Sequence, residues 1–137
     1  MMGNEYRPHL LPKIRSKAIM QAASGSPCTL RIASFYPGGK CSGRTNVVGC
    51  HLPVWGKGQS TKVTDLAVAF GCDVCHAILD GVDMKKHNYL MAHYEAAVMQ
   101  RLLFGLTETH AILAIKGIIE IPDNDGDPIE AEAFYGL

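Results

Sequence analysis

The sequence has no long apolar run and no composition typical of a disordered chain. No stretch approaches the roughly 18 consecutive apolar residues that a membrane-spanning helix needs, so we expect no membrane partner. The N-terminal stretch MMGNEYRPHLLPKIRSK has only a two-leucine apolar patch, which predicts an unexported, cytoplasmic protein. Of the 137 residues, 47% are apolar and 19% are charged, which is typical of a globular chain with a modest core.

Acidic residues are nearly missing from the first half of the chain. Residues 1–62 contain nine Lys or Arg and a single acid, Glu5, whereas residues 120–137 contain six acids and no base. Residues 63–119 have four bases and six acids. A first half with a charge of +8 is typical of a surface that binds a polyanion. The alternative is that the two ends neutralise each other across the fold, in keeping with the pI of about 7.0.

Apolar spacing and turn residues predict one domain, residues 1–137, of class α+β. The expected elements are a basic helix at 12–24, strands at 28–35 and 47–52, a helix at 73–79, a long helix at 86–106 and a further helix at 107–117. Gly105 is predicted to end the long helix, and Thr107 and Gly117 to cap the next one, so that 86–117 is a helical part. Residues 118–137 are expected to form a short apolar strand or arm and then an acidic tail.

The long predicted helix has a stripe of residues near one face. Its members are Leu90, His93, Tyr94, Ala97 and Arg101. Such a stripe fits either a core face or the contact face of a homodimer, and the sequence does not choose between them. We expect His93, like His87 and His110, to be a surface or core residue and not a ligand.

Five cysteines are an odd number, and in a reducing cytosol metal binding is a better default for them than disulfides. Cys28 and Cys41 have twelve residues between them, and Cys72 and Cys75 form a C-x-x-C pair thirty residues further on. Two pairs match the ligand count of a tetrahedral zinc site, which can contribute about 10–16 kcal/mol to a small fold. The alternatives are free buried thiols or a redox pair, although the βαβ pattern typical of a redox C-x-x-C is missing. Cys50 is expected to be a small apolar core residue.

Two histidines stand at positions that suit a catalytic or metal-binding role. His51 lies at the end of the second predicted strand, before a Gly- and Lys-rich loop, and His76 directly follows the C-x-x-C pair. Asp80 is four residues after His76 and therefore on the same face of a helix. An imidazole and a carboxylate at that spacing can hold one divalent cation and leave positions for water and phosphate oxygen. The alternative is that Asp80 pairs with a nearby Lys or caps the turn at Gly81.

A strand, a histidine, a long loop and a helix that begins with a histidine form the layout of the ββα-metal motif. On the stretches CTLRI, CHLPVWGKGQSTKVTDLAVAFGCDVCH and AILDG, residues 25–81 resemble the HNH endonuclease motif of the His-Me finger superfamily. They are most similar to the small phage and prophage nucleases of the YbcO type. The stretch IRSKAIMQAASGSPC is similar to the basic N-terminal helix of that family, residues 86–117 match loosely, and the acidic tail has no counterpart.

The resemblance implies a DNA endonuclease in the cytoplasm of a bacterial host, with a zinc-stabilised ββα core between a basic helix and C-terminal helices. It implies that His51 is the general base, that Asp65 orients this base, and that His76 is a ligand of the catalytic metal. Asp80 is the candidate for a second ligand of that metal, which is Mg²⁺ or Mn²⁺, or else Zn²⁺. The resemblance also implies that a structural Zn²⁺ is bound by Cys28, Cys41, Cys72 and Cys75.

Two departures from the family pattern bear on activity. Cys50 stands where the family often has an Asp or His metal ligand, and Asp65 stands where it usually has Asn. Both departures favour a weak or inactive enzyme. The alternative function is therefore a non-catalytic, zinc-stabilised nucleic-acid-binding protein, and a thiol redox protein is a third hypothesis.

Basic residues of the first half are the candidate phosphate contacts. In the loop WGKGQSTK, Gly56 and Gly58 would let the backbone approach a phosphate, while two lysines supply charge. Binding through such contacts is independent of sequence and sensitive to salt. The candidates are Arg15, Lys17, Arg31, Lys40, Arg44, Lys57 and Lys62. Whether the substrate is duplex, single-stranded or branched DNA, or RNA, does not follow from these residues.

Overall fold

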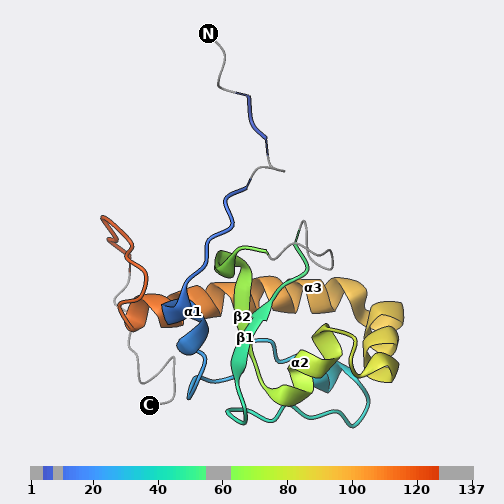
Figure 1. The fold of residues 1–137 in the computed structure, drawn as a ribbon. Coiled ribbons are helices and arrows are strands. Elements are labelled where there is room, and N and C mark those ends of the chain that lie inside the picture. The colour runs from blue at the N-terminus through green and yellow to red at the C-terminus, as the bar shows by residue number, and fades with distance from the viewer. Residues whose placement is uncertain (1–4, 8–10, 55–62, 127–137) are drawn as a thin grey trace.

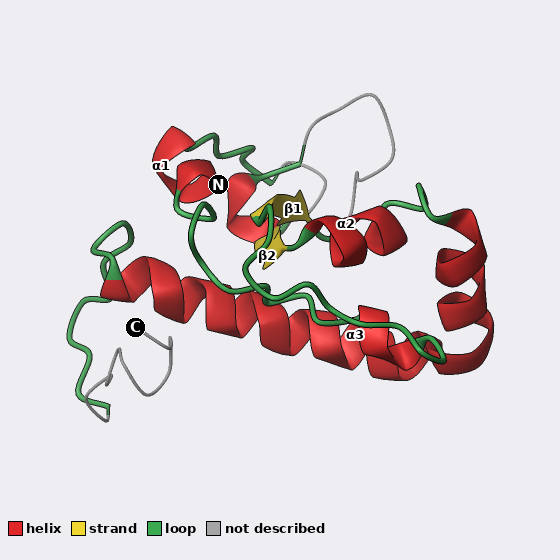
Figure 2. Cartoon of the chain, turned by 90° about the horizontal axis from the view of Figure 1, so that it is seen from below, coloured by secondary structure: helices red, strands yellow, loops and turns green. Residues whose placement is uncertain are grey.

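The computed structural model describes residues 5–7, 11–54 and 63–126, and Lys57 and Lys62 therefore lie outside the described residues. In chain order its elements are α1 (Lys17–Gln21), η2 (Ala33–Phe35), β1 (Val48–His51), η3 (Asp65–Ala67), β2 (Val68–Gly71), α2 (Asp73–Leu79) and α3 (Met84–Ile115). The fold is α+β, as predicted. Most of α3 forms one layer, and the small sheet with α1 and α2 lies against it (Figures 1 and 2).

The sheet consists of β1 and β2, which pair antiparallel. Val48 faces Gly71 and His51 faces Val68, so His51 lies at the end of the sheet opposite to the start of α2. Every residue of β2 is buried, whereas β1 exposes Val48. A side chain at position 71 is excluded, because a Cβ there would lie 2.4 Å from Leu30 Cδ1 and 2.8 Å from Cys50 Sγ. The predicted strand at 47–52 and helix at 73–79 are confirmed.

The predicted strand at 28–35 is wrong. Leu30 and Ile32 are buried, as the alternation indicated, but Arg31 between them has a φ of 44°, in the left-handed region. The amides of Thr29 and Leu30 both donate to the carbonyl of Phe70, at 2.6 and 3.1 Å, and η2 follows. The segment therefore folds across the end of β2 without extending the sheet, because its backbone turns at Arg31.

The basic helix is shorter than the predicted 12–24. It begins after Ser16, whose side chain accepts a hydrogen bond from the Ile19 amide at 3.2 Å, and its last residue is Gln21. Ile14 is not helical, and its carbonyl accepts a hydrogen bond of 2.8 Å from the Asp65 amide. Residues 11–15 form no regular secondary structure, so only the second half of the predicted helix forms.

The helical part is divided at a different place from the predicted one. A break at Gly105 and Thr107 is wrong, since α3 continues through both, while Tyr94 has non-helical φ and ψ of −139° and 26°. Figure 2 shows the first turns of α3 at an angle to the rest. Gly105 is buried, and a Cβ at this position would lie 2.3 Å from the Thr29 carbonyl oxygen. Its lack of a side chain thus allows α3 to approach the segment that precedes η2.

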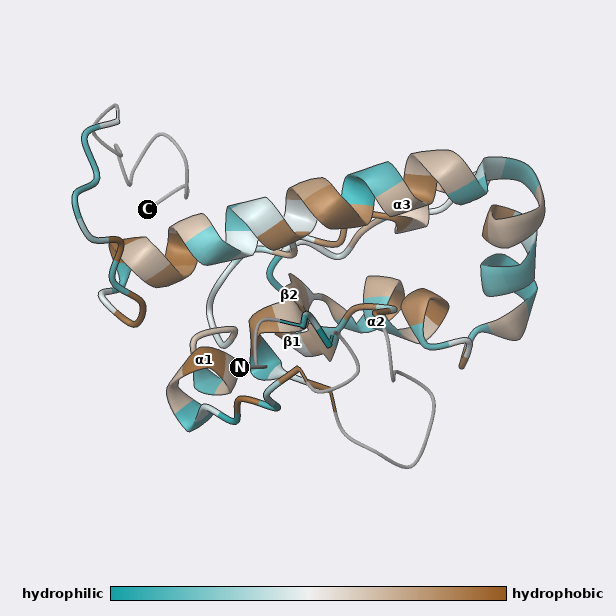
Figure 3. Cartoon of the chain, turned by 90° about the horizontal axis from the view of Figure 1, so that it is seen from above, coloured by the Kyte–Doolittle hydropathy of each residue, from teal (hydrophilic) through white to brown (hydrophobic). Residues whose placement is uncertain are grey.

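The buried face of α3 differs from the predicted stripe. Of that stripe only Leu90 is buried, whereas His93 and Tyr94 are exposed. The stripe prediction assumed a regular helix, and the change of backbone at Tyr94 rotates the residues that follow. Figure 3 shows apolar and polar residues interspersed along α3. The buried residues are Leu90, Val98, Leu102, Gly105, Thr109, Ile112 and Leu113.

A buried polar contact joins the two layers. The hydroxyls of Thr29 and Thr109 are 2.8 Å apart, and both residues are almost fully buried. Thr109 donates to the Gly105 carbonyl, and the Phe70 amide donates to the Thr29 hydroxyl, each at 2.8 Å. Because unpaired buried polar groups are costly, this network fixes how α3 lies on β2.

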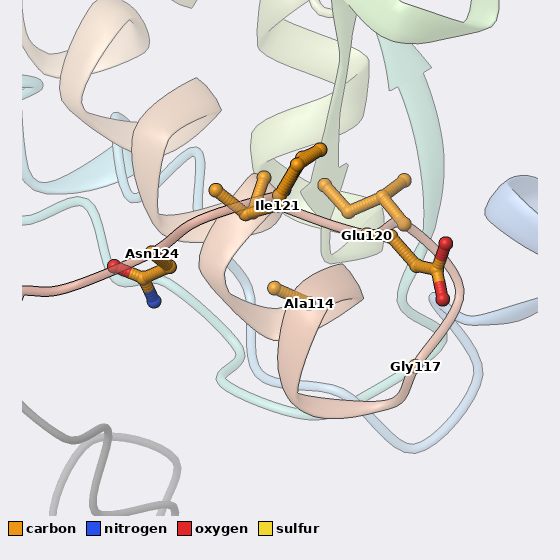
Figure 4. Close-up of a pocket in the computed structure, with 7 residues that line it drawn as sticks. Ala114, Gly117, Glu120, Ile121 and Asn124 are labelled. Carbon is orange, nitrogen blue, oxygen red and sulfur yellow. The ribbon is translucent and has the colours of Figure 1, made fainter.

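The predicted end of the helical part at Gly117 is confirmed. Gly117 has a φ of 71°, its amide donates to Ala114, and the Ile118 amide donates to Leu113 at 2.9 Å, which is a Schellman motif. The chain then turns back beside the helix end and forms a shallow hollow with Ala114, Glu120 and Ile121 (Figure 4). The apolar residues 118–121 are an arm and not a strand.

Within the described part of the chain, no helix combines the length and the apolar character that crossing a membrane would need.

Candidate functional site: a cysteine cluster and a histidine–aspartate pair

Four of the five cysteines gather at one end of the sheet. Cys28 precedes the turn at Arg31, Cys41 lies in the loop before β1, and Cys72 and Cys75 lie at the start of α2. Their Sγ atoms are all within 4.8 Å of one another, and those of Cys41 and Cys72 are 3.8 Å apart. Sulfurs about 2.3 Å from one tetrahedral Zn²⁺ would be separated by about 3.8 Å. The predicted grouping is confirmed, and the four cysteines could hold one metal ion such as zinc.

The surroundings of the cluster suit thiolates. The amide of Gly43 points at the Cys41 sulfur and that of Cys75 at the Cys72 sulfur, each at 3.4 Å. A hydrogen bond with Cys75 lowers the pKa of Cys28 to about 5, whereas burial raises the pKa of Cys41 to about 11. The hydrogen bond with Cys28 raises the pKa of Cys75. Without a cation, most of these four neighbouring thiols therefore stay protonated. A metal ion would replace the protons and stabilise the thiolates.

Glu108 of α3 supports the cysteine cluster through Arg31. Arg31 donates its backbone N–H to the Cys28 sulfur, and its φ of 44° turns the chain that follows away from an extended course. The Arg31 guanidinium pairs with Glu108, which also pairs with Arg101. Glu108 is largely buried, so α3 holds the turn that aims an amide at the candidate metal ligand.

Cys50 lies outside the cluster, in the core. It is 1% exposed, and its sulfur contacts the Val48 carbonyl at 3.4 Å. Position 50 therefore supplies packing next to Gly71, as the sequence predicted.

His51 and Asp65 meet at the other end of the sheet. Nε2 of His51 is 2.9 Å from Oδ1 of Asp65, which also accepts a hydrogen bond from Arg15 at 3.1 Å. Oδ2 accepts a 2.7 Å hydrogen bond from the Ser16 amide. Asp65 is 4% exposed, and η3 begins there because the Thr64 side chain caps the Leu66 amide. The structure thus brings together two residues that stand fourteen positions apart in the chain.

The protonation of this pair follows from its contacts. Burial opposes ionisation of Asp65, but the Ser16 amide, His51 and the Arg15 guanidinium outweigh it, so the pKa of Asp65 is lowered. An ionised carboxylate only accepts hydrogen bonds. In the neutral imidazole of His51, Nε2 therefore carries the proton and Nδ1 carries the lone pair that can accept one.

His76 and Asp80 form a second pair, on α2. Nε2 of His76 is 2.8 Å from Oδ2 of Asp80, and both side chains are more than one-third exposed. The predicted shared helical face is confirmed by this contact. Among the residues that the structure describes, the cysteine cluster is the only group of three or more potential ligands within reach of one ion. His76 and Asp80 alone thus offer two ligands to a metal.

The predicted basic track is partly engaged in ion pairs and hydrogen bonds within the protein. Arg15 pairs with Asp65, Arg31 pairs with Glu108, and Arg44 donates to the Gly25 carbonyl at 2.8 Å. Lys17 and Lys40 are exposed. The charge offered to a polyanion by the described residues is therefore smaller than the sequence count indicates.

Sequence reasoning missed several contacts that hold α3 and the surroundings of Asp65 in place. His110 Nε2 lies 3.0 Å from the Leu66 carbonyl, which ties α3 to η3, and His87 Nδ1 lies 2.8 Å from the Ile78 carbonyl. Neither contact has a sequence signal, because the accepting groups are backbone carbonyls. The contact of Arg15 with Asp65 was equally hidden, since fifty residues separate the two.

In comparisons with known proteins, no family model, curated protein or solved structure matches this chain significantly. Function therefore has to be inferred from the residues of the site.

Proposed function

We propose that this protein is a metal-dependent HNH-type endonuclease that hydrolyses DNA phosphodiester bonds, and that its four clustered cysteines bind a structural zinc. The observation that carries the proposal is the 2.9 Å contact between His51 and the buried Asp65, at the end of the sheet opposite to the start of α2. The chain order of two antiparallel strands and a helix supports the resemblance to the ββα-metal layout.

In the proposed reaction, Nδ1 of His51 takes a proton from the water that attacks phosphorus. Asp65 accepts the hydrogen bond from Nε2, holds the ring, and stabilises the imidazolium that forms. His76 and Asp80 would hold a divalent ion such as Mg²⁺ or Mn²⁺. When bound, such an ion supplies Lewis-acid stabilisation of the charge on phosphorus and on the leaving oxygen. The departing oxygen then takes its proton from solvent.

A second candidate function is a zinc-stabilised nucleic-acid-binding protein without catalysis. Two observations favour it. Among the described residues, the proposed catalytic metal would have two protein ligands, His76 and Asp80, and Cys50, at a position where the family often has a ligand, is buried in the core. Both candidates share the cysteine cluster. A thiol redox protein is less well supported, because four sulfurs meet where such a pair needs two.

The experiment that separates the candidates begins with elemental analysis of the purified protein. We expect about one zinc per chain, the stoichiometry of a four-cysteine site. Nicking of supercoiled plasmid in Mg²⁺ or Mn²⁺ is then compared for the wild type, His51→Ala and the control His93→Ala, an exposed histidine of α3. DNA binding is followed in parallel by fluorescence anisotropy.

The nuclease proposal predicts that His51→Ala lowers nicking by about 10²-fold or more, while DNA binding is retained and His93→Ala behaves as the wild type. Binding without nicking by the wild type in any divalent ion favours the second function. A reversible disulfide without bound metal favours the redox hypothesis.

A further inference from the structure

The segment before α1 makes contacts that the structure of α1 itself does not require. Three consecutive residues, Ile14 to Ser16, all bind Asp65: Ile14 accepts from its amide at 2.8 Å, Arg15 donates to Oδ1 at 3.1 Å, and the Ser16 amide donates to Oδ2 at 2.7 Å. Ser16 caps the helix through its side-chain oxygen, so its amide is not used by the cap. Both oxygens of the Asp65 carboxylate are thus bound from this segment.

We propose that Arg15 is a positioning residue of the His51 site, acting through Asp65 to keep the His51 ring in one orientation and one tautomer. The inference deepens the proposed function and rests on it for its catalytic meaning. Arg15 touches Asp65 and not His51, and it shares Oδ1 with His51.

The charge on Asp65 explains why an arginine is needed there. An amide at position 65, the common residue in the resembling family, needs no counter-ion, whereas a carboxylate whose side chain is 5% exposed is costly without one. The Arg15 guanidinium is 41% exposed, so the ion pair itself adds little to stability. Its effect is to hold Asp65 ionised and fixed, so that the imidazole finds an acceptor at Nε2.

The charged and titratable groups described around this pair come from several elements. Asp65 lies on η3, His51 at the end of β1, and Arg15 before α1, while His110 of α3 reaches the carbonyl of Leu66, next to Asp65. Of these groups, Arg15 alone forms an ion pair with Asp65 and is fully charged over the whole neutral pH range. Removing it should therefore change the pair without removing either of its members.

The test compares Arg15→Met, Arg15→Lys and the control Lys17→Met, an exposed residue of α1. Two NMR signals of the zinc-loaded protein are followed: the titration of the ¹³C-labelled Asp65 carboxyl, and the exchange of the proton on Nε2 of His51. We expect Arg15→Met to move the Asp65 titration to higher pH and to speed exchange of the His51 proton. Arg15→Lys should restore both in part, and Lys17→Met should match the wild type.

Cleavage kinetics add a second measurement if the protein cuts DNA. We expect Arg15→Met to lower kcat with little change in KM, and Lys17→Met to raise KM alone. Unchanged NMR signals in Arg15→Met would overturn the proposal, and so would a raised KM with unchanged kcat, which marks a phosphate contact. If the wild type cuts no DNA, the nuclease function fails, while the NMR signals still decide whether Arg15 positions His51.

Discussion

Asp65 combines burial, ionisation and three hydrogen-bond donors in one side chain, and this has a consequence for acid stability. Its pKa is lowered in the folded protein, so it stabilises the fold above its ordinary pKa of about 3.9 and loses that effect as pH falls through the lower, folded value. Asp65→Asn should therefore cost the most stability near neutral pH, and the difference from wild type should shrink as pH falls below about 4.

Urea unfolding of the wild type, Asp65→Asn and the exposed control Asp125→Asn at a series of pH values measures this. Asp65→Ala should destabilise by about 1–3 kcal/mol at pH 7, because it leaves the Ser16 amide without its acceptor. A pH-independent difference between wild type and Asp65→Asn would show that the carboxylate is not ionised preferentially in the fold.

Gly105 tests the close approach of α3 to the segment before η2. Alanine in a helix is ordinarily better than glycine by about 1 kcal/mol. Here the new Cβ would lie 2.3 Å from the Thr29 carbonyl oxygen, a backbone atom that cannot move alone. We expect Gly105→Ala to destabilise by about 1–3 kcal/mol in denaturant unfolding, while Thr107→Ala on the exposed face changes little. Stabilisation by Gly105→Ala would contradict the packing described.

The left-handed backbone of Arg31 can be separated from its ion pair with Glu108. Arg31→Ala loses the ion pair and keeps the backbone strain, whereas Arg31→Gly loses the ion pair and relieves the strain. The glycine variant should therefore be more stable than the alanine variant by about 1 kcal/mol in thermal or urea unfolding. Equal stabilities would indicate that the φ of 44° is not retained in solution.

At the scale of elements, prediction from sequence succeeded where local pattern and packing agree. The residues Asp73–Leu79 form α2 as predicted, since Cys72 caps the helix and its apolar side faces the core. The pattern at 28–35 also marked Leu30 and Ile32 as buried, but it could not reveal that Arg31 turns the backbone toward Cys28. Likewise the sequence predicts a helix stop at Gly105, because the need for space beside Thr29 arises only when the chain is folded.

Cys28 and Cys41 lie outside the helices and strands, and a metal ion bound by the cluster would tie both residues to the start of α2, so metal removal should destabilise the fold. We expect a chelator to lower Tm by at least about 10 °C, since each kcal/mol lost shifts Tm by about 3–5 °C in a domain of this size. Cys41→Ser should lose the metal, whereas Cys50→Ser should keep about one zinc per chain and lose only packing. Retention of a full zinc equivalent by Cys41→Ser would contradict the four-cysteine site.

At the scale of the whole molecule, the charge of the first half is partly neutralised by α3 and η3. Arg15 and Arg31 pair with acids from those elements, which leaves the exposed Lys13, Lys17 and Lys40 as the more available cations among the described residues of the first half. Ion pairs between residues this far apart in the sequence were not predictable from the charge count, because the count does not show which residues lie close together in the fold.

If the protein binds DNA as proposed, this distribution predicts how the affinity depends on salt. Lys17→Met and Lys40→Met should each reduce the slope of log K against log salt by about one, because each removes a proposed phosphate contact. Arg31→Met should change the slope much less, since its guanidinium is held by Glu108. Anisotropy titrations between about 50 and 200 mM salt measure this, and an Arg31 effect equal to that of Lys17 would mean that the ion pair opens on binding.

Three successive residues of α3 reach three separate parts of the protein. Glu108 holds Arg31 beside the cysteines, Thr109 meets Thr29, and His110 holds Leu66 beside Asp65. One extra residue inserted before them would rotate all three by about 100°. The rotational position of one turn of α3 therefore fixes the contacts at the cysteine end and at the histidine end of the sheet together. A shift of α3 that changed one set of contacts would also change the other.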